Sequence, residues 1–143
     1  LLFCNEYAIN VNDTAAKIPG VLYGRYQNDG YAGGNPWVLT TAALANLFYR
    51  GATYTTINGL PSSDALSVWS EVFGVPSSKI TAKSFLEAGD GVMQRLRTHV
   101  IADDYHLAEQ IDRNTGVQMS AEDLTWSYAE VLNAMTSRDE ATR

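Results

Sequence analysis

The stretch SAEDLTWSYAEVLNAM, residues 120–135, has the clearest helical pattern in this sequence and decides its fold class. Its apolar side chains recur four, seven, eight and eleven residues after the first, which places them along one face of an α-helix. Ser120 followed by Asp123 approximates a capping box, so we expect the helix to begin at Ser120. The apolar stripe consists of Leu124, Tyr128, Val131, Leu132 and Met135.

A second helix is predicted after the dipeptide Asn35-Pro36. Asn35 is a good N-cap, and Pro36 suits the first helical position because its missing N–H is not needed there. Apolar residues surround much of this run, which is typical of a helix buried between neighbours. Gly51 is expected to end it.

Two more helical runs lie between these segments, and together the four runs predict an all-α fold. One is expected to be capped by Ser62 or Ser63 and to stop at Gly74. The other extends over residues 82–101. Its Gly89-Asp90-Gly91 segment predicts a kink or a junction of two helices, because glycine weakens a helix interior.

Length and composition indicate one globular unit covering residues 1–143. The chain is 45% hydrophobic and carries a net charge of -6 without a basic stripe, which argues against nucleic acid as a partner and favours an uncharged ligand. No apolar run approaches the roughly 18 residues that span a bilayer, so no membrane segment is expected. Cys4 is the single cysteine, and we expect it to be a buried free thiol.

The first residues, Leu1-Leu2-Phe3-Cys4-Asn5, include neither an initiator methionine nor a basic segment. They are interpreted as a boundary inside a longer protein, although a mature end left by signal cleavage would look similar. Asn12-Asp13-Thr14 forms an N-glycosylation sequon, which matters only in a secreted protein.

The polar and aromatic segment 24–37 contains groups suited to binding a sugar. Arg25 offers a fork of donors to vicinal hydroxyls, and Asp29 can accept from the same hydroxyls. Tyr31 and Trp37 provide aromatic faces that pack against the C–H faces of a pyranose. The alternative is a surface Arg–Asp pair beside aromatic residues of the core, and composition does not separate the two.

The segment HLAEQID, residues 106–112, holds a carboxylate between apolar residues. Glu109 is followed by Gln110, an amide that can orient it, so Glu109 is a candidate catalytic base. Most acidic residues are solvated surface groups, and that alternative also fits Glu109.

The order of these segments resembles that of the fungal-type glucoamylases, inverting glycoside hydrolases whose catalytic domain is an (α/α)6 barrel. The resemblance covers nearly the whole chain except residues 50–82, which match poorly. The matching stretches are Gly24-Arg25-Tyr26 with Asp29 and Tyr31, Gly34-Asn35-Pro36-Trp37, Ala108-Glu109-Gln110, and residues 118–129 (QMSAEDLTWSYA).

The resemblance implies a role for each matching position. Glu109 falls on the family's general base, which activates the water that attacks the anomeric carbon, and Gln110 would assist it. Arg25 falls on an arginine that binds hydroxyls of the terminal glucose, supported by the carboxylate of Asp29. The aromatic positions that line or flank the sugar subsites are matched by Tyr31, Trp126 and Trp37.

Several residues depart from the family pattern. Gln27-Asn28 replaces Pro-Glu, and Ala32-Gly33 replaces larger polar residues, which could reshape the leaving-group subsite. Ile111 stands where tyrosine is common, and His106-Leu107 replaces a Gly-Ser-like pair. A more apolar wall around the base is expected, and burial of that kind raises the pKa of a carboxylate.

The function implied by the resemblance is exo-hydrolysis of α-1,4 bonds, and more slowly α-1,6 bonds, in starch or glycogen, releasing β-D-glucose without a metal or other cofactor. The family's general acid lies upstream, so we expect this chain to act with the remaining part of the same catalytic domain. The alternative is a non-catalytic glucan-binding or regulatory relative, for which Glu109 would not be needed. A helical scaffold without a sugar site leaves the Arg25 to Trp37 cluster unexplained. Location outside the cell or in an acidic vacuolar or lysosomal compartment is inferred from the family.

Overall fold

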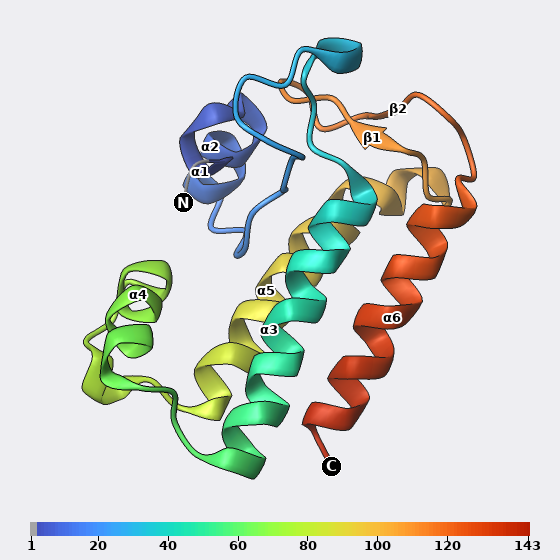
Figure 1. Ribbon diagram of the computed structural model, residues 1–143. Helices are drawn as coiled ribbons and strands as arrows, with labels where there is room; N and C mark the ends of the chain where they lie inside the picture. Colours follow the sequence, from blue (N-terminus) through green and yellow to red (C-terminus); the bar gives the residue numbers. More distant parts are fainter. Residues whose placement is uncertain (1–2) are drawn as a thin grey trace.

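The computed structural model describes residues 3–143 and contains six α-helices within that range (Figure 1). Leu1 and Leu2, on which the interpretation of the chain start partly rests, lie outside the described residues. The prediction of an all-α fold is confirmed, with one small antiparallel sheet besides. The elements are α1 (Phe3–Glu6), α2 (Ala8–Ala15), η1 (Tyr31–Gly33), α3 (Val38–Asn58), α4 (Ser63–Phe73), η2 (Ser77–Lys79), α5 (Ala82–Val100), η3 (Ile101–Asp103), β1 (Gln110–Ile111), β2 (Gln118–Met119) and α6 (Thr125–Ala141).

Three long helices form the body of the molecule, because α3 packs against both α5 and α6. Figure 1 shows that α3 and α6 begin at the same end, whereas α5 runs in the opposite direction. The β1–β2 hairpin lies at the end where α3 and α6 begin, and α4 lies on the other side of the body from α6. Two helix N-termini and the hairpin therefore meet at one end.

The start of the chain is helical, which the sequence analysis did not predict. Arg95 of α5 is 1% exposed and anchors this region, since its guanidinium donates to the backbone carbonyls of Pro19, Asn10 and Ile18. Asn10 in turn binds both the N–H and the carbonyl of Leu22. These bonds hold the segment that leads to Arg25.

The helix predicted after Asn35-Pro36 begins later and ends later than expected. Its N-cap is Trp37, which makes no side-chain capping bond, so the prediction that Asn35 caps the helix is wrong. The N–H of Val38 instead donates to the carbonyl of Glu109, and the carbonyl of Pro36 accepts from Ile111. Residues 36–38, where α3 begins, thus pair with residues 109–111.

The glycines inside α3 and α5 do not interrupt these helices, each of which is continuous. Gly51 lies in the middle of α3, where a Cβ would come within 2.8 Å of the Phe85 ring. At Gly89 of α5 a Cβ would come within 2.5 Å of the Tyr49 ring. The missing side chains therefore allow α3 and α5 to approach closely, and both predicted breaks are wrong.

The first turn predicted for the last helix is a loop, because α6 begins at Thr125 rather than Ser120. Ser120 and Asp123 have φ values of 68° and 48°, which a right-handed helix does not allow. The predicted stripe is only partly buried, with Leu132 62% and Met135 53% exposed.

Other predictions are confirmed or corrected at single positions. Ser62 caps α4 through its hydroxyl, which accepts from Ala65, and Gly74 ends that helix as expected. Cys4 is half-buried rather than buried. No helix among residues 3–143 is both long and apolar enough to cross a membrane.

Candidate functional site

The backbone around Glu109 is held by hydrogen bonds on both sides. Its N–H donates to the carbonyl of Ala121 at 2.9 Å, and its carbonyl accepts from Val38 at 3.1 Å. The preceding carbonyl, that of Ala108, accepts from the buried hydroxyl of Ser127 at 2.8 Å. Glu109 is thus fixed between the first turns of α3 and α6, as a preorganised catalytic group requires.

The carboxylate of Glu109 is oriented by its neighbour. Gln110 is completely buried, and its Nε2 donates to Oε2 of Glu109 at 3.1 Å. Its Oε1 accepts from Nδ2 of Asn35 at 3.1 Å. Because Glu109 itself is half-buried, it combines a fixed orientation with partial access.

Arg25 and Asp29 form a two-bonded ion pair in the loop that precedes α3. Nε and Nη2 of Arg25 donate to the two carboxylate oxygens of Asp29 at 2.7 and 2.8 Å. The hydrogen bonds from Arg25, together with the backbone N–H of Tyr31, lower the pKa of Asp29 to about 2. Asp29 is almost fully covered while the Arg25 side chain remains 31% exposed, so the pair presents its guanidinium outward.

Aromatic rings surround the exposed guanidinium. Arg25 lies 4.8 Å from the ring centroids of both Tyr31 and Trp37, and 5.3 Å from that of Tyr26. Trp37 is buried at 6% exposure, whereas Tyr26 and Tyr31 are more than half exposed. Trp37 therefore supports the guanidinium from inside, and the tyrosines remain open to a ligand.

The Arg25 cluster and the Glu109 segment are joined by an antiparallel backbone bridge between Trp37 and Gln110. This bridge places the residue that supports Arg25 beside the residue that orients Glu109. Trp126, 60% exposed, lies in the first turn of α6 next to Ser127, which binds the carbonyl before Glu109. The fold thus brings the predicted positions, which are up to a hundred residues apart, to the same end of the helices (Figure 1).

The family model for glycosyl hydrolases family 15 matches residues 3–136. The chain belongs to this family. A glucoamylase from Blastobotrys adeninivorans is 33% identical over 94% of the chain, and Glucoamylase-1 from Schizophyllum commune is 36% identical over 92%. Among solved structures, the glucoamylase of Hormoconis resinae matches with a TM-score of 0.77 and 29% identity, covering 96% of this chain and 25% of that one.

The family 15 chain spans about a quarter of the length of the curated relatives it matches, since it covers 25% of each of the two glucoamylases. The matching structures are (α/α)6 barrels, so the predicted barrel portion is confirmed at the level of the fold.

The structure also reveals a polar cluster that sequence reasoning missed. Nδ1 of His106 lies 2.7 Å from Oδ1 of Asp123, which also accepts from the Tyr128 hydroxyl at 2.6 Å. The hydrogen bond to Asp123 raises the pKa of His106, while those from Tyr128 and His106 lower the pKa of Asp123. Since the Tyr128 hydroxyl accepts from the N–H of Leu107, the cluster borders the Glu109 segment.

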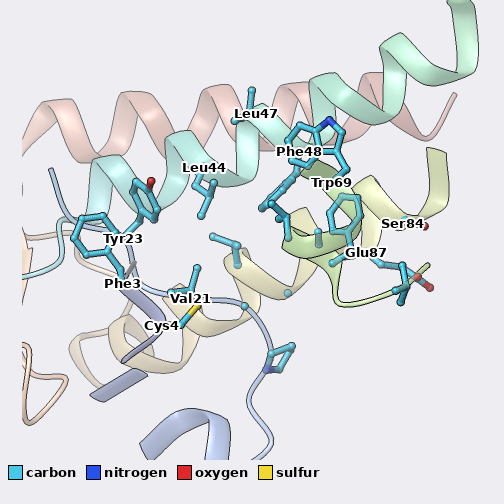
Figure 2. Close-up of a pocket in the computed structure, with 18 residues that line it drawn as sticks. Phe3, Cys4, Val21, Tyr23, Leu44, Leu47, Phe48, Trp69, Ser84 and Glu87 are labelled. Carbon is cyan, nitrogen blue, oxygen red and sulfur yellow. The ribbon is translucent and has the colours of Figure 1, made fainter. Parts of the chain in front are cut away.

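A cavity of about 570 Å³ lies elsewhere, between α3, α4, α5 and the start of the chain (Figure 2). Its walls are mainly apolar and contain neither Glu109 nor Arg25. Within the part of the chain that the structure describes, no group of three acidic, His or Cys side chains is arranged to hold a metal ion. Residues lining the cavity include Phe3, Cys4, Leu44, Leu47, Phe48 and Trp69.

Proposed function

We propose that the chain forms the sector of a glucoamylase catalytic domain that supplies the general base. The whole protein would release β-D-glucose by inverting exo-hydrolysis of α-1,4 bonds, and more slowly α-1,6 bonds, in starch, glycogen or maltooligosaccharides. The observation that carries this proposal is the anchored Glu109, whose backbone is bonded on both sides and whose carboxylate accepts from Gln110.

In the proposed reaction Glu109 removes a proton from the water that attacks the anomeric carbon. Gln110 binds Oε2, so the other carboxylate oxygen is left for that water. Inversion requires a second carboxyl group about 6.5–9.5 Å away that protonates the leaving oxygen. We assign that general acid to a part of the protein outside this chain.

The terminal glucose is proposed to bind at the Arg25 cluster. Arg25 would donate to sugar hydroxyls, and Asp29 would keep its guanidinium in place. Tyr31 and Trp126 would offer exposed aromatic faces to the sugar rings. Trp37, buried beneath the guanidinium, would contribute to binding through Arg25.

The apolar cavity in Figure 2 is proposed to receive helices from the remaining part of the same domain. The chain spans about a quarter of the length of these two relatives, so the rest of the domain would pack against surfaces that this chain leaves open. Leu47 at 55% exposure and the exposed side chains of Leu132 and Met135 on α6 are apolar surfaces of this kind. We further propose that the whole protein is secreted or resides in an acidic compartment.

The decisive experiment measures glucose release from maltose by the full-length protein and by its Glu109→Gln variant. A loss of roughly a hundredfold or more in kcat is expected, because general-base catalysis contributes that much. An unchanged rate would place the base elsewhere. Glucan binding by a wild-type protein that releases no glucose would identify the non-catalytic module instead. The anomer that appears first, followed by polarimetry, tests inversion separately.

A further inference from the structure

We propose that Asn35 is a positioning residue for Glu109, acting through the amide of Gln110. The inference rests on the proposed function of Glu109 as a general base. It assigns a role in catalysis to a side chain whose hydrogen-bond partners are Ala32, Gln110, Met119 and Arg113, and not the carboxylate itself.

The orientation of the Asn35 amide follows from its partners. Asn35 is 3% exposed, and its Oδ1 accepts from the backbone N–H of Arg113 at 3.1 Å. Its Nδ2 donates to the carbonyl of Ala32 at 2.8 Å. A flipped amide would place Nδ2 against an N–H and Oδ1 against a carbonyl, so only one orientation satisfies both bonds.

This orientation determines that of Gln110. Nδ2 of Asn35 faces Oε1 of Gln110 at 3.1 Å, so Oε1 is the acceptor and Nε2 points the other way. Nε2 then meets Oε2 of Glu109, also at 3.1 Å. Because Gln110 is completely buried, rotation of its amide would leave unmatched groups without water to satisfy them.

The anchoring of Asn35 is itself structural. The preceding Gly34 has φ of +67°, and a Cβ there would come within 1.9 Å of the Asp29 carbonyl oxygen. Only glycine permits this tight approach. The turn connects the loop that carries Arg25 to Asn35, so the same loop that presents the guanidinium also sets the amide beside the base.

Two consequences for the proposed base follow from the chain Asn35–Gln110–Glu109. The N–H of Gln110 holds the carboxylate in one orientation. The bond also occupies Oε2 and leaves the other oxygen for the water. Loss of Asn35 frees Gln110 to turn its carbonyl oxygen toward the carboxylate, and two acceptors facing each other would displace the carboxylate from that orientation.

The test uses the full-length protein with Asn35→Ala and Asn35→Ser, each measured for kcat and KM on maltose. Asn35→Ser removes the amide donor to Gln110 but keeps a hydroxyl that can bond to the surrounding backbone groups, so it remains informative if Asn35→Ala fails to fold. In both variants kcat should fall roughly tenfold, the effect of losing one hydrogen bond to a charged group. The KM should change little, because the proposed sugar-binding residues are not among the hydrogen-bond partners of Asn35.

Combining Asn35→Ala with Gln110→Ala distinguishes a positioning role of Asn35 from general structural support. When Gln110 is already replaced by alanine, Asn35→Ala should have no further effect on kcat. A matched control is Asn46→Ala, which removes an amide contact from α3 to Glu130 of α6. Its kcat and KM should equal those of the wild type.

Three results would overturn the proposal. One is a kcat of Asn35→Ala equal to that of Asn46→Ala, and another is an effect of Asn35→Ala that persists undiminished without Gln110. The third is a kcat of Asn35→Ser equal to that of the wild type. The proposed function fails separately, if Glu109→Gln keeps its activity.

Discussion

Replacement of Ser127 by alanine should weaken both the fold and the catalytic step proposed for Glu109. The Ser127 hydroxyl is completely buried and donates to the carbonyl of Ala108, the residue before Glu109, at 2.8 Å. Alanine removes the donor without adding volume. The variant therefore isolates one hydrogen bond between α6 and the segment that carries Glu109.

The expected loss of stability follows from burial of the acceptor. A buried carbonyl left without its donor costs about 1–3 kcal/mol in the free energy of unfolding. Since displacement of a catalytic group by about 1 Å can cost a hundredfold in rate, kcat on maltose should fall roughly tenfold or more. The KM should change less, because Ser127 lies outside the Arg25 cluster.

Urea unfolding and maltose kinetics of the full-length variant provide the measurement. Ser62→Ala is the matched control, because it also removes one serine hydroxyl bonded to the backbone, at the N-cap of α4. That site follows the far end of α3, which is 21 residues or about 30 Å long. The control should lose about 1 kcal/mol of stability and keep its kcat.

Two outcomes would refute the reasoning. Unchanged stability in Ser127→Ala would mean that the Ala108 carbonyl does not depend on this donor. A stability loss with kcat equal to that of Ser62→Ala would mean that the bond supports the fold without positioning Glu109.

Three other perturbations test the packing, the polar cluster and the open surface. Gly89→Ala should destabilise the domain by about 1–3 kcal/mol in urea unfolding, because its Cβ would clash with the buried Tyr49 ring; a stability gain would contradict this. The pKa of His106 is raised above 6.5 and that of Asp123 is lowered below 3.8, so this ion pair stabilises the fold fully between these two pH values. The stability lost in His106→Asn should therefore be largest from about pH 4 to 6.5. The difference from the wild type should shrink as the pH rises through the raised pKa of His106. A difference independent of pH would exclude that linkage. In the full-length protein Leu47→Asp should cost at least about 2 kcal/mol if the rest of the domain covers it, whereas a change below about 0.5 kcal/mol would leave this surface in solvent.

Local signals predicted some helix ends and failed at others for an identifiable reason. The cap at Ser62 and the stop at Gly74 were predicted correctly, because both act within their own helix. Asn35 has the same capping propensity, but its side chain bonds to Ala32, Gln110 and Arg113 instead. Competition from distant partners decided its conformation.

The glycine predictions failed for a related reason. The backbone freedom of glycine predicts breaks at Gly51 and Gly89. In the structure these positions matter because the absence of a side chain leaves room for an aromatic ring. Which meaning applies depends on what packs against the glycine. The Phe85 ring packs against Gly51 and the Tyr49 ring packs against Gly89, and in each pair the two residues lie far apart in sequence.

By itself, the sequence indicated the all-α class through apolar periodicity, and the resemblance of its motif order to the glucoamylases predicted the residues of the candidate site. It did not predict the backbone bridge between Trp37 and Gln110, the hydrogen bonds that link Asn35, Gln110 and Glu109, or the His106–Asp123 pair. Periodicity and capping express preferences within a few residues of chain, so they can be recognised locally. The orientation of the half-buried Glu109 carboxylate depends on Gln110 and on Asn35, which is 75 residues from Gln110, and only the tertiary structure brings those groups within hydrogen-bonding distance.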